Sequence, residues 1–340
     1  MKAVIDEKIP YLSEALMAMG VDVVALPGID IRNSDLLDAQ ALFVRTRTMC
    51  DASLLANTAV RFIGTATIGY DHIDTAYCRE NGILWTNAAS CNAGAVLQYV
   101  QSVVYSWARD NSCSLLGLTI GIVGLGEIGS RVAEWAGSVG MRVLANDPPK
   151  TDAGAVGLVT LEEIARECDI ITFHPSLNVD GVYKSVHLAD AAFFASLRHC
   201  RLFINASRGE VVDNALLSRA IAEGRCVGCL DVWENEPTID RELPDRVAIA
   251  TPHIAGYSAQ GKANATAMSV RAVARHFGLP LTEFYPTDVE RVAACPIEWA
   301  DMCATIDRYC DLEGESRPLR ENPELFEHLR NTYHYREEYF

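Results

Sequence analysis

The sequence has no long apolar run and is poor in positive charge. No uninterrupted apolar stretch approaches the roughly 20 residues that a membrane-spanning helix requires. Lysine and arginine number 29 against 45 aspartates and glutamates, so the formal net charge is −16. Such a chain repels nucleic acid and anionic membrane surfaces. We therefore expect neither as a partner, and an anionic small substrate would need a local group of cations.

A secretory leader and a disulfide framework are not expected either. The first residues carry acids at Asp6 and Glu7, where a signal peptide needs its apolar core. The eleven cysteines are an odd number and stand mostly among apolar neighbours, which predicts reduced thiols in a cytoplasmic protein. We interpret the C-x-x-C from Cys226 to Cys229 as part of a buried strand rather than a redox or zinc motif, and predict no metal site.

Apolar runs of strand length alternate with helical patterns through most of the chain. Such alternation predicts parallel sheets with helices on both faces, an α/β fold with two Rossmann-like doubly wound domains, the first of them flavodoxin-like. Strands are expected over 2–6, 21–26, 41–46, 61–66, 83–87, 119–123, 141–147, 169–174, 201–205, 227–233 and 247–252.

Two helical patterns mark the expected domain boundaries. A long helix over 93–110 would lead out of the first domain, and a helix over 260–277 would return the chain to it. We expect a discontinuous substrate-binding domain of residues 1–92 and 255–278, and a second domain of 93–254. Residues 279–340, which are richer in charge and proline, would form a small appended unit.

The second domain contains a G-x-G-x-x-G pattern between an apolar strand and a helix. In that context the glycines permit a tight turn, close approach of a pyrophosphate and close helix packing, so the pattern predicts a dinucleotide site. The expected cofactor contacts in this motif are Gly124, Gly126, Glu127, Ile128 and Gly129. The next strand ends at Asp147, whose carboxylate would bind ribose hydroxyls and favour NAD over NADP, although Lys150 lies nearby.

A histidine, an acid and an arginine follow later strands. His253 lies in "TPHIAGYS", Glu236 in "LDVWENEP" and Arg208 in "NASRGE". Loops after the carboxyl ends of parallel strands converge on one crevice. A carboxylate beside an imidazole fixes its tautomer and stabilises its charged form, and a guanidinium can bind a substrate carboxylate. These residues therefore predict an acid/base site, with Gly209 leaving room for close approach.

Four stretches, VGLGEIG, NASRGEVVDNALL, LDVWENEP and PHIAGYS, resemble the D-specific 2-hydroxyacid dehydrogenase family. The likeness runs through residue 277. Further stretches, including FIGTATIGYDHID, SCNAGAVLQYV and the tail RPLRENPELFEHLRNTY, are similar to a member whose substrate is a small phosphorylated 2-hydroxy acid. The resemblance implies NAD as cofactor and a homodimer, with a C-terminal dimerisation unit that is shorter here.

The resemblance also implies roles for individual residues. Arg208 and Glu236 would be catalytic, with His253 as the proton donor and acceptor. The implied NAD contacts are Asp147, Ala206, Ser207, Arg208, Asp231 and Gly256. The implied substrate contacts are Thr46, Thr67 and Tyr257.

The chain departs from the family pattern at several places, one of them Ser90-Cys91-Asn92-Ala93 where the family has Gly-Cys-Asn-Ala. It has His-Pro-Ser-Leu at 174–177 where the family has His-Thr-Pro-Leu, which removes a threonine that would face NAD. It has Met49 where a lysine is expected, so we expect Arg45, Arg47 and Lys262 to supply positive charge for a phosphate.

Two alternative functions remain for the chain. It could be another 2-hydroxyacid dehydrogenase, such as one acting on 3-phosphoglycerate, or an NAD-sensing binding protein of the corepressor type.

Overall fold

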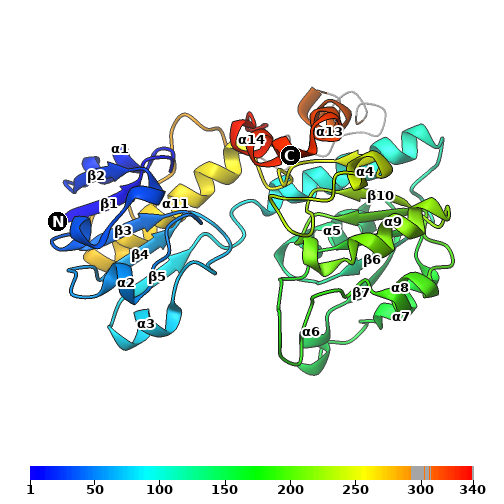
Figure 1. The fold of residues 1–340 in the computed structure, drawn as a ribbon, viewed down its shortest axis with the longest axis horizontal. Coiled ribbons are helices and arrows are strands. Elements are labelled where there is room, and N and C mark those ends of the chain that lie inside the picture. Colours follow the sequence, from blue (N-terminus) through cyan, green and yellow to red (C-terminus); the bar gives the residue numbers. More distant parts are fainter. Residues whose placement is uncertain (292–301, 303–305, 307, 339–340) are drawn as a thin grey trace. The chain divides into compact units, whose positions relative to one another are not determined.

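The computed structural model describes residues 1–291, 302, 306 and 308–338 (Figure 1). The chain divides into two compact units: a first unit of Met1–Asn92 and Ser258–Val292, and a second unit of Ala93–Tyr257 and Ala293–Phe340. Each contains a parallel sheet, which confirms the predicted α/β class. None of the helices in the described residues combines the length and the apolar character needed to cross a bilayer.

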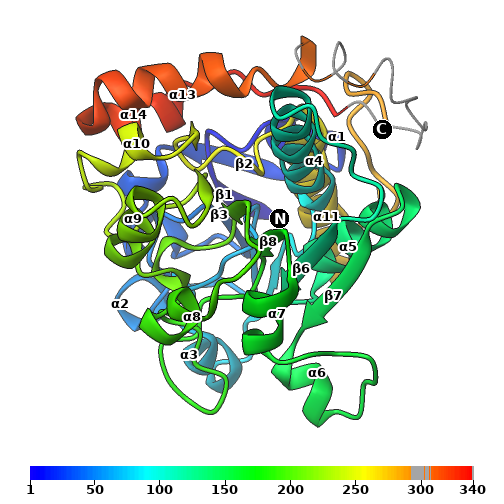
Figure 2. The same cartoon turned by 90° about the vertical axis from the view of Figure 1, so that its right-hand side faces the viewer.

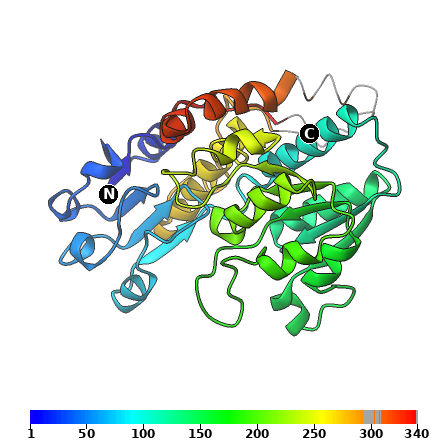
Figure 3. The same ribbon diagram turned by 45° about the vertical axis from the view of Figure 1, so that its right-hand side comes forward.

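The first unit has the strand order β2-β1-β3-β4-β5, the flavodoxin-like order that the sequence predicted. Alternate residues of β1 face opposite sides of the sheet, as the two-residue period of a strand requires. Ile5 packs on the face of the sheet that α1 and α11 cover, and Val4 packs on the opposite face, which α2 and α3 cover. The gold helix α11 runs along the blue and cyan strands of this unit (Figure 3).

The elements of the first unit are β1 Lys2–Asp6, α1 Leu12–Ala18, β2 Asp22–Leu26, 3-10 turns at Gly28–Asp30 and Asn33–Leu36, β3 Ala41–Val44, α2 Ala52–Leu55, β4 Phe62–Thr65, α3 Thr75–Glu80, β5 Leu84–Asn87 and α11 Ala259–Phe277.

The second unit has the strand order β11-β10-β9-β8-β6-β7, with every pairing parallel. Helices α4 and α5 cover one face of this sheet and α7, α8 and α9 cover the other (Figure 2). The chain runs from β6 outward to β7 and then returns to β8 on the other side of β6. In sheets of this kind a ligand binds at that reversal, outside the carboxyl ends of the strands.

The elements of the second unit before the tail are α4 Ala93–Asp110, β6 Thr119–Val123, α5 Glu127–Ser138, β7 Arg142–Asn146, α6 Pro148–Asp152, α7 Leu161–Glu167, β8 Ile170–Phe173, α8 Ala191–Ser196, β9 Leu202–Asn205, a 3-10 turn at Gly209–Val211, α9 Asn214–Ala222, β10 Val227–Leu230, α10 Leu243–Arg246 and β11 Ile249–Ala250.

The described tail helices, α13 (Leu312–Glu321) and α14 (Phe326–Thr332), follow each other across a 3-10 turn at Pro323–Leu325. They lie beside α10 (Figure 2). The backbone nitrogen of Ala250 in β11 donates to Ser316 Oγ of α13 at 3.1 Å, and Phe326 is buried in the second unit's core. The tail therefore covers the edge strand of the sheet, which would otherwise present unpaired backbone groups.

The observed division differs from the expected appended unit of residues 279–340. Residues up to Val292 group with the first unit, and the remainder groups with the second. The tail docks because α13 is amphipathic and its buried residues, Leu312, Ser316 and Leu319, repeat at helical spacing. The functional assignment of the units, including a dimerisation role for the tail, stays a prediction.

Candidate active site

His253 lies in the loop after β11 in an uncommon backbone conformation. Its φ is 58°, in the left-handed region that side chains other than glycine seldom adopt. Its backbone nitrogen donates to the carbonyl oxygens of Asp231 (2.7 Å) and Thr251 (3.0 Å). A residue in this region costs on the order of 1 kcal/mol, so the surrounding hydrogen bonds must hold it in place.

The buried carboxyl of Asp231 organises that loop. Its side chain is 1% exposed and accepts hydrogen bonds from Thr251 Oγ1 (2.7 Å), Ile254 N (2.7 Å) and Ala255 N (2.9 Å). Burial raises the pKa of Asp231, and the charge of His253 and these hydrogen bonds offset the rise only in part. Tyr99 of α4 extends the network by contacting Thr251 Oγ1 at 2.7 Å. The implied NAD contact of Asp231 stays a prediction.

Glu236 meets the imidazole of His253 directly. Its Oε2 lies 2.7 Å from His253 Nδ1, and its Oε1 accepts a hydrogen bond from the backbone nitrogen of Trp233 at 3.0 Å. Burial acts to raise the pKa of Glu236, but the hydrogen bond with His253 and the other contacts outweigh it and lower the pKa. Because an ionised carboxylate only accepts, Nδ1 carries a hydrogen and Nε2 is left to exchange a proton.

Arg208 lies in the neighbouring loop, after β9. Asn205 shapes this loop: its Nδ2 donates to the carbonyl of Arg208 at 2.9 Å, and its Oδ1 accepts from Ser207 N and Oγ. The half-buried guanidinium of Arg208 donates to the carbonyl of Ser207 at 2.7 Å. The predicted residues thus stand on loops that follow the adjacent strands β9, β10 and β11, at the same edge of the sheet.

Gly209 has a different role from the expected one. A Cβ at this position would lie 1.9 Å from the carbonyl oxygen of Trp233. The close neighbour is therefore the backbone of the loop that carries Glu236, rather than open space for a ligand. Glycine at 209 lets the Arg208 and Glu236 loops pack directly on each other.

The glycine motif has the geometry that a dinucleotide requires. Gly126 caps α5, and a Cβ there would meet nothing within 4 Å, which leaves room for a phosphate at the helix N-terminus. A Cβ on Gly129 would lie 2.0 Å from the carbonyl oxygen of Gly124, so only glycine permits this helix packing. A Cβ on Gly124 would collide with the backbone at His174 and Pro175, after β8. The motif and the β8 loop therefore meet at the strand reversal, and these residues fit NAD.

Asp147 follows β7 and is held against the glycine loop. Its Oδ2 accepts from Leu125 N at 2.8 Å and its Oδ1 from Lys150 N at 3.0 Å. Lys150 Nζ donates to the Leu125 carbonyl at 2.5 Å. The implied contact with ribose hydroxyls stays a prediction, and so does the preference for NAD over NADP.

The other predicted substrate residues belong to the first unit. Arg45, Thr46 and Arg47 follow β3, and Thr67 follows β4, all at the carboxyl edge of that sheet. Arg45 Nε is 3.0 Å from Oδ2 of the buried Asp6, so its guanidinium is already engaged. Lys262 lies in α11. Phosphate binding by Arg45, Arg47 and Lys262, and substrate contact by Thr46 and Thr67, stay predictions.

Thr67 is part of a polar network in the first unit. Its Oγ1 lies 2.6 Å from Thr65 Oγ1 and donates to the carbonyl of Gly69 at 2.9 Å. Thr65 Oγ1 is in turn 3.1 Å from His72 Nε2. Burial lowers the pKa of His72, which favours the neutral ring beside these hydroxyls.

The tail places one more cation in the second unit's site. Arg330 of α14 donates from Nε to the hydroxyl of Tyr257 at 3.2 Å, and its Nη1 lies 3.9 Å from Glu236 Oε2. Sequence reasoning assigned no role to Arg330. No spacing rule relates residue 330 to residue 236. In the sequence, the signal for a role of this segment was the similarity of the tail to that of a family member.

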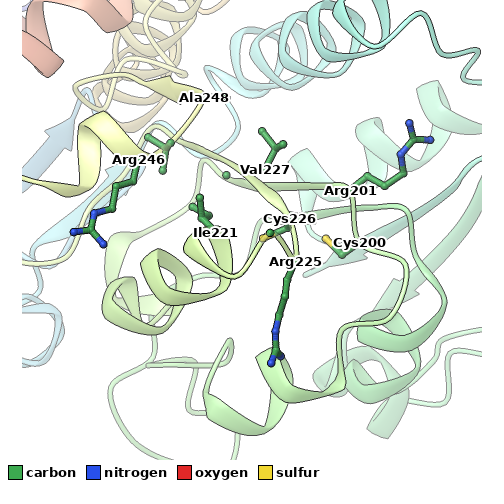
Figure 4. Close-up of a pocket in the computed structure, with 11 residues that line it drawn as sticks. Cys200, Arg201, Ile221, Arg225, Cys226, Val227, Arg246 and Ala248 are labelled. Atoms are coloured by element: carbon green, nitrogen blue, oxygen red, sulfur yellow. The ribbon is translucent and has the colours of Figure 1, made fainter.

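A cavity of about 520 Å³ lies at the opposite edge of the second unit's sheet, before β9 and β10. It is lined by arginines, but Figure 4 shows Arg201, Arg225 and Arg246 pointing away from one another, so they form no anion site. Cys226 also lines it, and Cys226 and Cys229 are both buried, as the structural interpretation of the C-x-x-C requires. Within the described residues no cluster of histidine, cysteine or acidic residues could hold a metal ion.

Comparisons with known proteins identify the family. Residues 89–255 match the model of the D-isomer specific 2-hydroxyacid dehydrogenase NAD-binding domain. An erythronate-4-phosphate dehydrogenase of Bacteroides thetaiotaomicron is 47% identical over 99% of this chain and 97% of its own length. One of Cronobacter sakazakii is 40% identical over 100% of this chain and 92% of its own.

Solved structures share the fold. The NAD⁺-bound 3-phosphoglycerate dehydrogenase of Entamoeba histolytica has a TM-score of 0.66 and 23% identity, over 86% of this chain and 99% of its own. The predicted family and the predicted cofactor are thereby confirmed. The chain belongs to the D-isomer specific 2-hydroxyacid dehydrogenases, which are NAD-dependent enzymes.

Proposed function

We propose that this chain oxidises 4-phospho-D-erythronate at C2 to (R)-3-hydroxy-2-oxo-4-phosphooxybutanoate, a step of vitamin B6 synthesis. The observation that carries the proposal is the 2.7 Å contact between His253 and Glu236, in the unit that carries the dinucleotide motif. Relatives named erythronate-4-phosphate dehydrogenase, 40% and 47% identical over nearly the whole chain, support the choice of substrate.

Three side chains have distinct roles in the proposed reaction. Nε2 of His253 takes the proton of the C2 hydroxyl, because Nδ1 is committed to Glu236. The Glu236 carboxylate stabilises the ring once it is charged. The guanidinium of Arg208 binds the substrate carboxylate through paired hydrogen bonds and orients C2. NAD, when bound, supplies the acceptor for the hydride that leaves C2.

We further propose that the protein works in the cytoplasm as a homodimer. The described cysteines are free thiols, which suits a reducing compartment. The support for a homodimer is the likeness of the tail sequence to the dimerisation unit of the family member described above.

The test is NADH formation followed by absorbance, with 4-phospho-D-erythronate, D-erythronate and 3-phosphoglycerate as substrates. We expect the highest kcat/KM for the phosphorylated four-carbon acid. Preference for 3-phosphoglycerate would favour the other family activity. If no acid of the panel were oxidised while NADH still bound, the NAD-sensing alternative would replace the proposal.

A further inference from the structure

We propose that Arg330, together with the hydroxyl of Tyr257, forms a binding subsite for the terminal phosphate of the substrate. The inference rests on the proposed function, and it names the group that distinguishes this substrate from simpler 2-hydroxy acids. The subsite is supplied by the tail helix α14, which lies outside the residues that match the family's NAD-binding domain.

The guanidinium is anchored on one side and open on the other. Its Nε donates to the Tyr257 hydroxyl at 3.2 Å, and its Cζ lies 6.0 Å from the centre of the Tyr257 ring. In the described part of the chain, neither terminal nitrogen of Arg330 donates a hydrogen bond to a protein acceptor. The side chain is 32% exposed, so it is in contact with solvent.

The neighbouring acid does not saturate this cation. Glu236 Oε2 lies 3.9 Å from Arg330 Nη1, at the limit of an ion pair, while its hydrogen bonds go to His253 and Trp233. Both oxygens of Glu236 are therefore used elsewhere. Burial raises the pKa of Glu236, and the contacts with His253 and Trp233 lower it. The positive charge of Arg330 makes a smaller contribution to that lowering. It also remains available to a ligand.

A phosphate needs a cation of this type in this protein. The chain carries a net charge of −16, so a substrate with a carboxylate and a phosphate is captured only where local positive charge exceeds that background. In the proposed function Arg208 binds the carboxylate, so the phosphate needs a further cation. The sequence predicted Arg45, Arg47 and Lys262 for this role, and the structure adds Arg330 beside Glu236. The planar guanidinium presents paired donors that match a phosphate.

The tail is fixed firmly enough to position Arg330. Arg336, six residues further on and 6% exposed, donates to the carbonyls of Ala95 and Ile254, both at 3.0 Å, and to that of Ala255. Ile254 and Ala255 directly follow His253. The same stretch of chain thus binds the histidine loop and presents Arg330 to it.

The experiment compares Arg330→Met, Arg330→Lys and the control Arg317→Met, an exposed arginine of α13. Calorimetric titrations of the NADH-loaded protein with 4-phospho-D-erythronate and with D-erythronate measure binding directly. Assays of NADH formation measure kcat and KM. Thermal unfolding and NADH affinity establish that each variant is folded.

We expect Arg330→Met to weaken 4-phospho-D-erythronate binding and raise its KM by about 10- to 100-fold, as expected for lost charge-assisted hydrogen bonds. Its kcat should change only a few-fold, and its affinity for D-erythronate should not change. Arg330→Lys should recover part of the affinity, because lysine restores the positive charge but lacks the planar pair of N–H donors of a guanidinium. Arg317→Met should behave as the parent protein.

Two results would overturn the subsite. In the first, the parent protein oxidises 4-phospho-D-erythronate, and a folded Arg330→Met variant binds this acid with unchanged affinity. That result would remove the subsite and leave the proposed function in place. The other is an equal loss for phosphorylated and unphosphorylated acids, which would assign Arg330 to support of Glu236. A parent protein that neither binds nor oxidises 4-phospho-D-erythronate would remove both the subsite and the proposed function.

Discussion

At the residue scale, the imidazole of His253 is held from two directions. Asp231 fixes the backbone on both sides of the residue, and Glu236 fixes the ring through Nδ1. Such double support is what a proton-transfer group requires, because the reacting nitrogen must stay within hydrogen-bond reach of the substrate hydroxyl. The left-handed backbone at His253 is sustained by the same contacts.

Replacing His253 with asparagine should reduce turnover by about 10² to 10⁴, the usual contribution of a general base. Asparagine suits the test because it tolerates the left-handed backbone better than most residues. NADH affinity, measured by fluorescence titration, should remain close to that of the parent. Near-normal turnover in a folded variant would mean that another group takes the proton.

Replacing Glu236 with glutamine should move the acid limb of the kcat/KM profile for oxidation to lower pH. The same contact that lowers the pKa of Glu236 places its negative charge beside the imidazole, and a neutral amide removes that charge. Rates should also fall, because the amide has one acceptor atom where the parent side chain accepts from both Trp233 and His253. A profile with an unmoved acid limb would contradict the pairing.

The sequence was sufficient for the His253–Glu236 pair and insufficient for the cations around it. Both residues of the pair follow neighbouring strands, so the convergence of loops in a parallel sheet predicts their meeting. Arg45 is engaged by Asp6 from another strand, and Arg330 reaches Glu236 from a tail helix. Contacts made across elements in this way leave no periodic signal in the sequence.

At the element scale, strands and helices follow the apolar runs closely, and the differences occur where the site begins. The strand expected over 227–233 ends at Leu230, and that expected over 247–252 is reduced to Ile249–Ala250. In both, the backbone leaves the sheet to make site contacts: the indole of Trp233 donates to the carbonyl of Thr251 at 2.9 Å. The β propensity of these residues predicts longer strands, but hydrogen bonds such as that of Trp233 end the strands earlier.

Two glycines of α5 provide a matched test of the dinucleotide motif. Gly129→Ala should destabilise the protein by about 1–3 kcal/mol and weaken NADH binding, because its Cβ would lie 2.0 Å from the Gly124 carbonyl. Gly137→Ala in the same helix meets nothing within 4 Å and should stabilise by roughly 0.5–1 kcal/mol. Chemical unfolding measures both. Equal stability of the two variants would contradict the packing described at Gly129.

At the scale of the whole molecule, the structure contains the two predicted doubly wound units, and the described tail helices pack on the second of them. Charge and proline content suggested a separate piece, whereas the described helices α13 and α14 pack on the second unit and cover β11. The content of charged residues and proline in a segment predicts its solvent exposure only on average. A helix whose few apolar residues all lie on one face can still be a firmly docked element.

Acid should destabilise the fold partly through His174. Burial lowers the pKa of His174 to about 3, and in the described structure its Nδ1 is buried without a hydrogen-bond partner. An unfolded histidine titrates near 6.5, so between about 6.5 and 3 the unfolded chain binds a proton that the folded one does not. This stabilising contribution is complete above the unfolded pKa and is lost as pH falls, by at most about 1.4 kcal/mol per pH unit.

Chemical unfolding of the cofactor-free protein at pH 7, 6 and 5 checks this dependence. The parent and a His199→Gln control, which changes an exposed histidine, should show the same slope. The His174→Gln variant should show a smaller one. An identical slope in all three proteins would mean that His174 does not contribute to acid sensitivity.

In the proposed reaction the molecule removes the C2 hydrogen of a phosphorylated four-carbon hydroxy acid and passes it to NAD. The most direct measurement uses 4-phospho-D-erythronate that carries deuterium at C2, with mass analysis of the NADH and the acid after turnover. We expect deuterium in the nicotinamide ring of NADH and a 2-oxo acid without it. Deuterium retained in the acid, or released to water, would contradict the proposed reaction.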